Sequence, residues 1–92
     1  MGIACYNDEV TIALMDACRI LDRRIPEDVA LVGVDAIPLS ALVWPRLTTI
    51  SIDLEVIFAT LGAIVIDQIA GKSAEIPDLT ENLHVIPGGT TR

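Results

Sequence analysis

The chain alternates between short, nearly continuous apolar runs and longer segments in which apolar residues recur every three or four positions. Residues 3–6 and 29–34 form two such runs, and residues 8–22 between them place their apolar side chains on one helical face. This order predicts a strand, a helix and a second strand. Because the connection in such a unit is right-handed, we expect the two strands to lie parallel in one sheet.

Two further strands and a second helix are predicted after this unit. Residues 47–52 are rich in β-branched side chains and residues 83–86 form a short apolar run, so both are expected to be strands. Residues 54–70 are expected to be a helix, with Asp53 as its cap and Gly71 just beyond its end. The fold class is therefore α/β, with a parallel sheet built from βαβ units. The remaining segments are predicted to be loops or, at the end, a loose tail, over residues 36–46, 72–82 and 87–92.

The second predicted helix is apolar around most of its circumference. Between Val56 and Ile66 the only polar side chain is Thr60. Such a helix is expected to be buried on more than one side, and Gly62 within it is expected to allow close packing against a neighbour. A membrane span needs about 20 apolar residues. This run is much shorter, so we expect no membrane insertion.

Composition and charge exclude direct binding to nucleic acid. The 92 residues carry a net charge of -7, and the six basic side chains are scattered along the chain. A protein that binds the phosphate backbone needs a clustered positive surface. Hydrophobic residues make up 52% of this short chain, so part of its apolar surface is expected to lie against another polypeptide. We therefore expect a homodimer or higher self-association.

The sequence offers no constellation for metal binding or catalysis. Cys5 and Cys18 are the only cysteines and His84 is the only histidine, which leaves no framework for a disulfide, a zinc site or Cys–His catalysis. Asp8 and Glu9 are consecutive helical residues that do not face each other, and no nucleophile accompanies them. We expect no enzyme activity, no metal site and no cofactor. No signal peptide is visible, which favours a cytoplasmic protein.

Two polar residues follow the strands of the first predicted unit. Asn7 comes directly after the first strand and Asp35 directly after the second. Parallel strands bring their carboxyl ends to one edge, where open α/β sheets bind small ligands. An amide that donates and accepts, beside a carboxylate that accepts two hydroxyls, suits a hydroxyl-rich ligand. Each residue also has a structural explanation, since Asn7 can cap the helix and Asp35 can form a turn after Gly33.

Two aromatic residues are further candidates for this site. Tyr6 lies at the end of the first strand, where it would line the crevice or enter the core. Trp44 would stack on a sugar ring, or else anchor a core or an interface as large aromatic side chains do. Leu42 and Val43, just before it, belong to a segment that is too apolar for a free loop. Such a patch indicates a partner surface.

The joint spacing of several short motifs resembles the LacI/GalR family of bacterial transcriptional regulators. The resemblance covers nearly the whole chain and is to the C-terminal part of the effector-binding domain, which is similar to periplasmic sugar-binding proteins. The chain departs from the family pattern at Asp22, where a helix-ending glycine is usual, and at Ala36, where a second acid is frequent. The motifs are Tyr6-Asn7-Asp8-Glu9-Val10, Ala13-Leu14, Ala17, Ile25-Pro26-Glu27-Asp28-Val29-Ala30-Leu31-Val32-Gly33-Val34-Asp35 and Pro45-Arg46-Leu47-Thr48-Thr49-Ile50.

The resemblance implies that the chain is one segment of a two-subdomain sensor. Residues 1–45 and 83–92 would belong to its C-terminal subdomain, and residues 47–82 would cross to the N-terminal subdomain. The chain would then be part of a repressor or activator that contacts DNA only through a helix-turn-helix domain outside these residues. Two other functions stay open: a solute-binding protein of the same fold, and a small autonomous α/β interaction module without a ligand.

The resemblance also implies roles for single residues. In the family, the residues that match Asn7 and Asp35 hydrogen-bond the effector, which is typically a sugar or a purine-like metabolite. The segment that carries Leu42 and Val43, with the helix before it, contributes to the dimer interface. We expect Tyr6 to lie beside the effector site.

Overall fold

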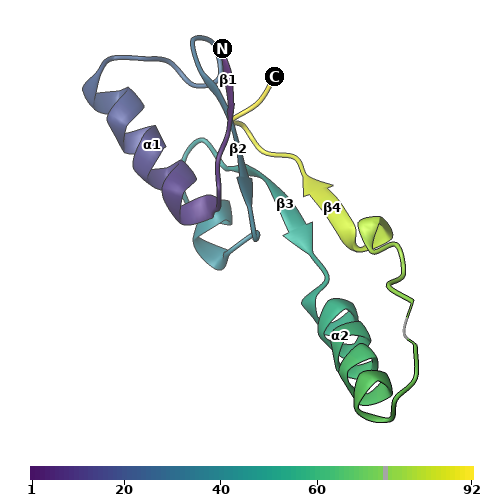
Figure 1. Ribbon diagram of the computed structural model, residues 1–92. Helices are drawn as coiled ribbons and strands as arrows, with labels where there is room; N and C mark the ends of the chain where they lie inside the picture. The colour runs from purple at the N-terminus through teal and green to yellow at the C-terminus, as the bar shows by residue number, and fades with distance from the viewer. Residues whose placement is uncertain (74) are drawn as a thin grey trace. The chain divides into compact units, whose positions relative to one another are not determined.

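The computed structural model describes residues 1–73 and 75–92, so residue 74, within the predicted loop 72–82, lies outside the described residues. The chain divides into two compact units, one formed by Met1–Ser51 with His84–Arg92 and the other by Ile52–Leu83. The predicted division between two subdomains of a larger sensor stays a prediction. In chain order the elements are β1 (Gly2–Ala4), α1 (Asp8–Ile20), β2 (Ala30–Val34), the 3-10 turn η1 (Pro38–Ala41), β3 (Thr48–Ile52), α2 (Leu54–Ile69), the 3-10 turn η2 (Thr80–Asn82) and β4 (Leu83–Ile86) (Figure 1).

The strands form one sheet in the order β1-β2-β3-β4. Strand β1 pairs in parallel with β2, with Ile3 opposite Leu31, and β2 pairs in parallel with β3, with Gly33 opposite Thr49. Strand β4 runs in the opposite direction to β3, as the arrows in Figure 1 show. The predicted α/β class and the parallel βαβ unit are confirmed, and the sheet gains one antiparallel edge strand.

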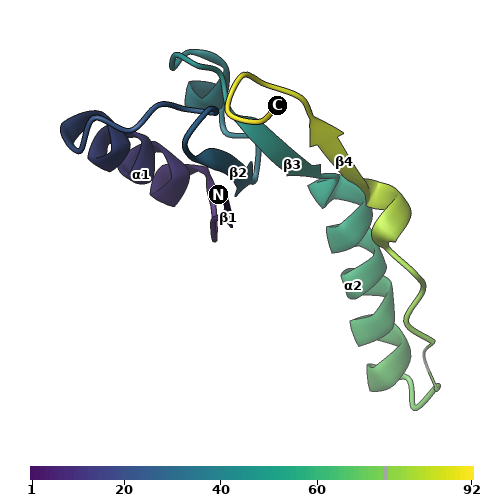
Figure 2. The same cartoon turned by 90° about the horizontal axis from the view of Figure 1, so that it is seen from above.

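The core of the first unit lies between α1 and one face of the β1–β2 pair. Figure 2 shows these elements from above. Leu31 is fully buried there, packed with Cys18 and Val29. Burial alternates along β2, so that Leu31 and Gly33 are buried while Val32 and Val34 are only half-buried. Near-continuous apolar runs such as this one are typical of strands buried on both faces. Among the described residues of this chain, however, α1 covers only one face of β2.

Helix α1 begins and ends at residues that its sequence predicts. Asn7 has extended backbone angles, and its side-chain oxygen Oδ1 accepts a hydrogen bond from the Val10 amide at 2.9 Å. At the other end Asp22 has a φ of 55°, and the next amide, that of Arg23, donates to the Cys18 carbonyl at 2.8 Å. Aspartate therefore adopts the left-handed conformation that ends many helices at glycine.

The loop before β2 is closed by the Asp28 carboxylate. Its Oδ2 atom accepts from the backbone amide of Arg24 at 2.8 Å, and its two oxygens accept from the Arg24 guanidinium at 3.1 and 2.9 Å. These hydrogen bonds favour the charged carboxylate. The side-chain bond from Arg24, followed by the backbone bond, lowers the pKa of Asp28 from its ordinary 3.8 to about 2.

We expect this lowered pKa to appear as a loss of stability in acid. A carboxyl group whose pKa is lower in the folded state stabilises the fold above its unfolded pKa, and the contribution is lost as pH falls toward the folded value. For Asp28 the loss should occur between pH 3.8 and about 2. Chemical denaturation across this range should show that the free energy of unfolding depends less steeply on pH in Asp28→Asn than in the unaltered protein. If the free energies of the two proteins changed in parallel with pH, the lowered pKa of Asp28 would be contradicted.

The last residues of the chain are held in the sheet, so the expectation of a loose tail is wrong. Thr90 is fully buried; its hydroxyl donates to the Leu31 carbonyl at 2.7 Å and accepts from the Thr48 amide at 2.9 Å. The Leu31 amide in turn donates to the Thr90 carbonyl at 2.8 Å. The tail thus joins the beginnings of β2 and β3. Gly88 is required by this path, because a Cβ there would clash with the backbone of Arg46 and Leu47.

In the second unit, α2 begins at the predicted residue and ends one residue before the predicted end, but it lacks the predicted surroundings. None of its residues is buried, and among the described residues no atom outside the nearby backbone of the helix and the two neighbouring residues lies within 4 Å of the place where a Cβ on Gly62 would stand. The expected burial on more than one side is therefore not met within this chain, since its described part buries no residue of the helix. Asp53 occupies the N-cap position without a side-chain hydrogen bond, contrary to prediction, whereas Gly71 ends the helix with a φ of 75° as predicted. Among the described residues no helix is long and apolar enough to cross a membrane.

Candidate functional site

The carboxyl ends of β1 and β2 carry the amide predicted for the site. Asn7 follows β1 and stands at the amino end of α1. Its Oδ1 atom caps the helix by accepting from Val10, so the structural explanation of this residue is correct. In the described part of the chain its Nδ2 group donates to no protein atom. The cap therefore orients the side chain and leaves the amide nitrogen available at the sheet edge.

Asp35 stands at the same edge, directly after β2, in an uncommon backbone conformation. Its φ is 103° and that of Ala36 is 53°, a region that residues other than glycine enter only at a cost of about 1–3 kcal/mol each. The turn is held in place because the Asp35 amide donates to the Ile50 carbonyl at 2.9 Å and the Ala36 amide donates to the Thr49 hydroxyl at 3.3 Å. The Asp35 side chain is exposed, and its carboxylate accepts no hydrogen bond from the described residues.

A buried carboxylate that sequence reasoning missed connects the segments that carry these two residues. Asp8 is fully buried. Its Oδ2 atom accepts from the Ile37 amide at 3.1 Å and the Ser40 hydroxyl at 2.5 Å, and its Oδ1 atom accepts from the Thr49 hydroxyl at 2.6 Å. The sequence showed Asp8 only as an acid in the first turn of a helix. Its partners lie 29 to 41 residues away, and no local pattern announces them.

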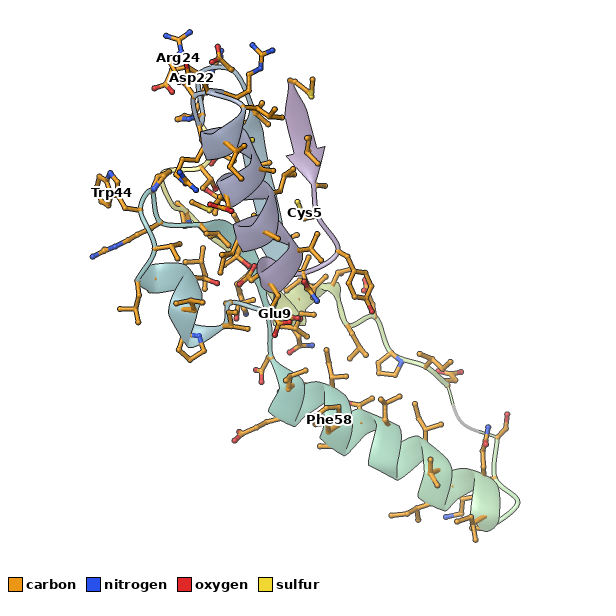
Figure 3. The ribbon with its side chains drawn as sticks, turned by 90° about the vertical axis from the view of Figure 1, so that its left-hand side faces the viewer. Cys5, Glu9, Asp22, Arg24, Trp44 and Phe58 are labelled. Atoms are coloured by element: carbon orange, nitrogen blue, oxygen red, sulfur yellow. The ribbon has the colours of Figure 1, made fainter. Side chains whose placement is uncertain are left out.

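The two aromatic candidates lie at different places. Tyr6 is 86% exposed and directly precedes Asn7, so it stands at the same edge and outside the core. Trp44 is 87% exposed and precedes β3, which places it at the amino edge of this parallel pair, opposite to the carboxyl edge. Figure 3 shows its ring projecting away from the ribbon. The structure therefore brings Tyr6, Asn7 and Asp35 to one edge and does not bring Trp44 there, because Trp44 comes before its strand and the others come after theirs.

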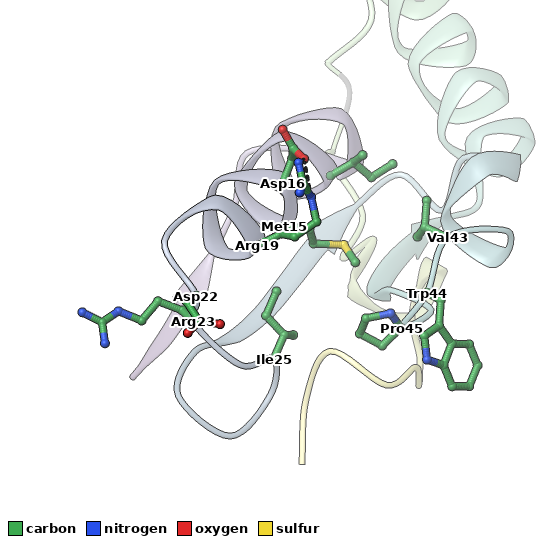
Figure 4. A pocket seen from close by; sticks show the side chains of 10 residues that line it. Met15, Asp16, Arg19, Asp22, Arg23, Ile25, Val43, Trp44 and Pro45 are labelled. Atoms are coloured by element: carbon green, nitrogen blue, oxygen red, sulfur yellow. Dashed lines mark hydrogen bonds and ion pairs between the residues drawn. The ribbon is translucent and has the colours of Figure 1, made fainter.

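A separate hollow of about 550 Å³ lies between α1 and the segment that carries Val43, Trp44 and Pro45 (Figure 4). Met15 points across it toward this segment. Its lining combines apolar side chains with charged ones. The lining residues are Ile12, Met15, Asp16, Arg19, Asp22, Arg23, Ile25, Val43, Trp44 and Pro45. Leu42, just before the segment, is 78% exposed, so the apolar surface continues beyond the hollow.

Comparison with known proteins assigns the chain to a family. The model of the periplasmic binding protein-like domain matches residues 1–91. The chain is 47% identical over 49 residues to the arabinose metabolism transcriptional repressor of Halalkalibacterium halodurans. These 49 residues are 53% of this chain and 13% of that protein. It is 35% identical over 71 residues to the ribose operon repressor of the same organism, covering 77% of this chain and 22% of that protein. The chain thus spans less than a quarter of these relatives.

Solved structures of regulators share the fold. A periplasmic binding protein/LacI transcriptional regulator from Alkaliphilus metalliredigens, complexed with D-xylulofuranose, has a TM-score of 0.74 and 30% identity over 99% of this chain and 34% of its own. A LacI family regulator from Arthrobacter, in complex with lactose, has a TM-score of 0.70 and 27% identity over 99% of this chain and 35% of its own. Because the family model matches nearly the whole chain and these relatives are LacI-type regulators, the chain belongs to the periplasmic binding protein-like domain family, in its LacI/GalR branch.

Proposed function

We propose that this chain forms one wall of the effector site of a LacI-type transcriptional regulator, and that the effector is a sugar. Asn7 and Asp35 would hydrogen-bond its hydroxyls, and Tyr6 would lie beside it. The chain would act by binding, within a longer cytoplasmic regulator, and not by catalysis. DNA would be contacted by residues outside this chain, whose net charge is -7.

One observation carries the proposal: an available amide and an available carboxylate stand at the same sheet edge on anchored backbone. Capping orients Asn7, and three consecutive amides, those of Asp35, Ala36 and Ile37, are hydrogen-bonded to neighbouring elements. A site held in this way binds without first ordering its own loop, which favours affinity. The carboxylate can accept from two neighbouring hydroxyls while the amide nitrogen donates, the pattern that a sugar presents.

The names of two matching repressors and the ligands in two matching structures support a sugar. The matching repressors act on arabinose metabolism and on the ribose operon, and two matching structures hold D-xylulofuranose and lactose. Isothermal titration of the intact protein with ribose, arabinose, D-xylulose and lactose tests the proposal. At least one of these sugars should bind with saturable heat. A protein that binds none of them at millimolar concentration would contradict it.

We propose further that Leu42 and Val43 lie in a subunit interface. Leu42 is 78% exposed, Leu39 on the preceding turn is 49% exposed, and the hollow lined by Val43 adjoins them. Contiguous apolar surface of this kind marks contact with another protein. A second copy of the same regulator is the partner that we infer, because this segment contributes to the dimer interface in the resembled family.

Substitution of an interface residue with aspartate should dissociate the dimer. We expect Leu42→Asp to raise the dimer dissociation constant of the intact protein by about thirtyfold or more, because it buries an unpaired charge in place of an apolar anchor. Sedimentation velocity measures the change. Ile76→Asp is a matched control, since Ile76 is also 78% exposed and lies in the second unit. Equal dissociation by both variants, or by neither, would contradict the assignment.

A further inference from the structure

We propose that Asp8 is a positioning residue for the effector site: its buried carboxylate sets the turn that carries Asp35 relative to Asn7. This inference rests on the proposed function, because it concerns the same site. Asp8 itself would not touch the effector, since its side chain is fully buried.

The carboxylate joins three segments that are distant in the sequence. It belongs to the first turn of α1, next to the capping residue Asn7. Through Oδ2 it accepts from the Ile37 amide, two residues after Asp35, and from the hydroxyl of Ser40 in η1. Through Oδ1 it accepts from the hydroxyl of Thr49 in β3. One buried side chain therefore holds together the first turn of α1, the turn after Asp35 and strand β3.

Thr49 extends this connection to the turn itself. While its hydroxyl donates to Asp8 at 2.6 Å, its oxygen accepts from the Ala36 amide at 3.3 Å. Both amides that follow Asp35 are thus fixed, Ala36 through Thr49 and Ile37 directly. A turn with positive φ at both Asp35 and Ala36 persists only when its surroundings hold it, and these bonds are the surroundings that do so.

The carboxylate packs directly against the backbone of β2. Gly33, in β2, faces Asp8, and a Cβ at that position would clash with its Oδ1 atom. The carboxylate is therefore enclosed on the sheet side by backbone and satisfied by three donors. Moving it would displace the Asp35 turn, so the distance between the Asn7 amide and the Asp35 carboxylate depends on it.

Asp8→Asn tests the proposal with little change of volume. The amide oxygen can replace Oδ2 and keep the bonds from Ile37 and Ser40. The amide NH₂ group then meets the Thr49 hydroxyl, which must accept from it while it also accepts from Ala36. The bond that the Thr49 hydroxyl donates to the Asp8 carboxylate is then lost. We expect the affinity of the intact protein for the sugar that it binds best among ribose, arabinose, D-xylulose and lactose to fall about tenfold, the effect of this one lost charge-assisted bond.

A matched control separates this effect from a general loss of a carboxylate. Asp28→Asn also removes a carboxylate that accepts from a backbone amide and from a side chain, but it lies in the loop before β2. That variant should lower thermal stability while leaving sugar affinity unchanged. An equal loss of affinity in Asp28→Asn would overturn the proposal.

A double-mutant cycle of Asp8→Asn and Asp35→Asn distinguishes a positioning role from a merely structural one. It compares the effect of Asp8→Asn on sugar affinity with and without the Asp35 carboxylate. If Asp8 acts through Asp35, Asp8→Asn should weaken sugar binding by less than about twofold once Asp35 is already asparagine, because the two effects are coupled. Its effect on the melting temperature should be the same in both backgrounds. The same tenfold loss of affinity in both backgrounds would overturn the inference and leave the proposed function standing. An unaltered protein that binds none of the four sugars would overturn both.

If Asp8→Asn fails to fold, the Thr49 pair keeps the proposal testable. Thr49→Ser retains the hydroxyl and should keep affinity within about twofold of the unaltered protein, whereas Thr49→Val removes both bonds and should lower it about tenfold. Amide hydrogen exchange should report faster exchange at Ala36 in the valine variant alone. Equal affinity in the two variants would overturn the role assigned to this hydrogen-bonded connection.

Discussion

Replacing Asp35 with asparagine should weaken sugar binding by the intact protein about a hundredfold. The carboxylate is exposed and accepts no bond from the described residues, so its two oxygens are open to two hydroxyls of a ligand. Hydrogen bonds to a charged group contribute about 1.5–3 kcal/mol each, and 2.7 kcal/mol corresponds to a hundredfold change in affinity. Asparagine tolerates positive φ, so the turn at 103° should be retained. Isothermal titration measures the effect.

The same substitution at Asp22 is the matched control. Asp22 is also exposed and also has positive φ, at 55°, but it ends α1 instead of following a strand. Asp22→Asn should leave sugar affinity unchanged. Because asparagine keeps the backbone preference at both positions, a difference between the two variants reports on the carboxylate and not on the turn. Unchanged affinity in Asp35→Asn would contradict the site.

Replacing Gly33 with alanine should destabilise the protein by about 3 kcal/mol or more, at the upper end of the range for overpacked interiors. A Cβ at this position would clash with Asp8 Oδ1 and would lie 2.9 Å from Thr11 Oγ1. Both neighbours are fully buried and hydrogen-bonded, so neither can move aside cheaply. Total stabilities are only about 5–15 kcal/mol. Urea denaturation measures the loss.

Gly62→Ala should have the opposite effect on stability to Gly33→Ala. Apart from the backbone of α2 itself and the two neighbouring residues, no atom of the described residues lies within 4 Å of the place where its Cβ would stand, and the residue is inside α2. Alanine is favoured over glycine in helices by about 1 kcal/mol, so this variant should be stabilised. If Gly33→Ala were as stable as the unaltered protein, the close packing of Asp8 against Gly33 in β2 would be contradicted.

Local patterns predicted the elements of the fold well, and long-range contacts account for what they missed. Among the described residues, the alternation of apolar runs and helical periodicity placed every strand and both α-helices to within two residues, because that information lies within a few residues. The tail was missed because the bonds of Thr90 to Leu31 and Thr48 span 59 and 42 residues. The exposure of α2 was missed because an apolar helix does not reveal what covers it.

The candidate site was predictable where topology alone decides it. Parallel pairing of β1 and β2 is enough to place Asn7 and Asp35 at one edge. The same topology separates Trp44 from these residues, because Trp44 comes before β3 whereas Asn7 and Asp35 come after their strands. Asp8 could not be found from sequence, since its role depends on Ser40 and Thr49, which reach it only in the folded chain.

A crystal structure of the intact protein with its sugar bound is the most direct test of the effector site. We predict that sugar hydroxyls donate to the Asp35 carboxylate and that Asn7 Nδ2 donates to a sugar oxygen, with the Asn7 cap to Val10 retained. The Asp8 bonds to Ile37, Ser40 and Thr49 should be unchanged by the ligand. A sugar bound at a site that touches neither Asn7 nor Asp35 would contradict the proposed function.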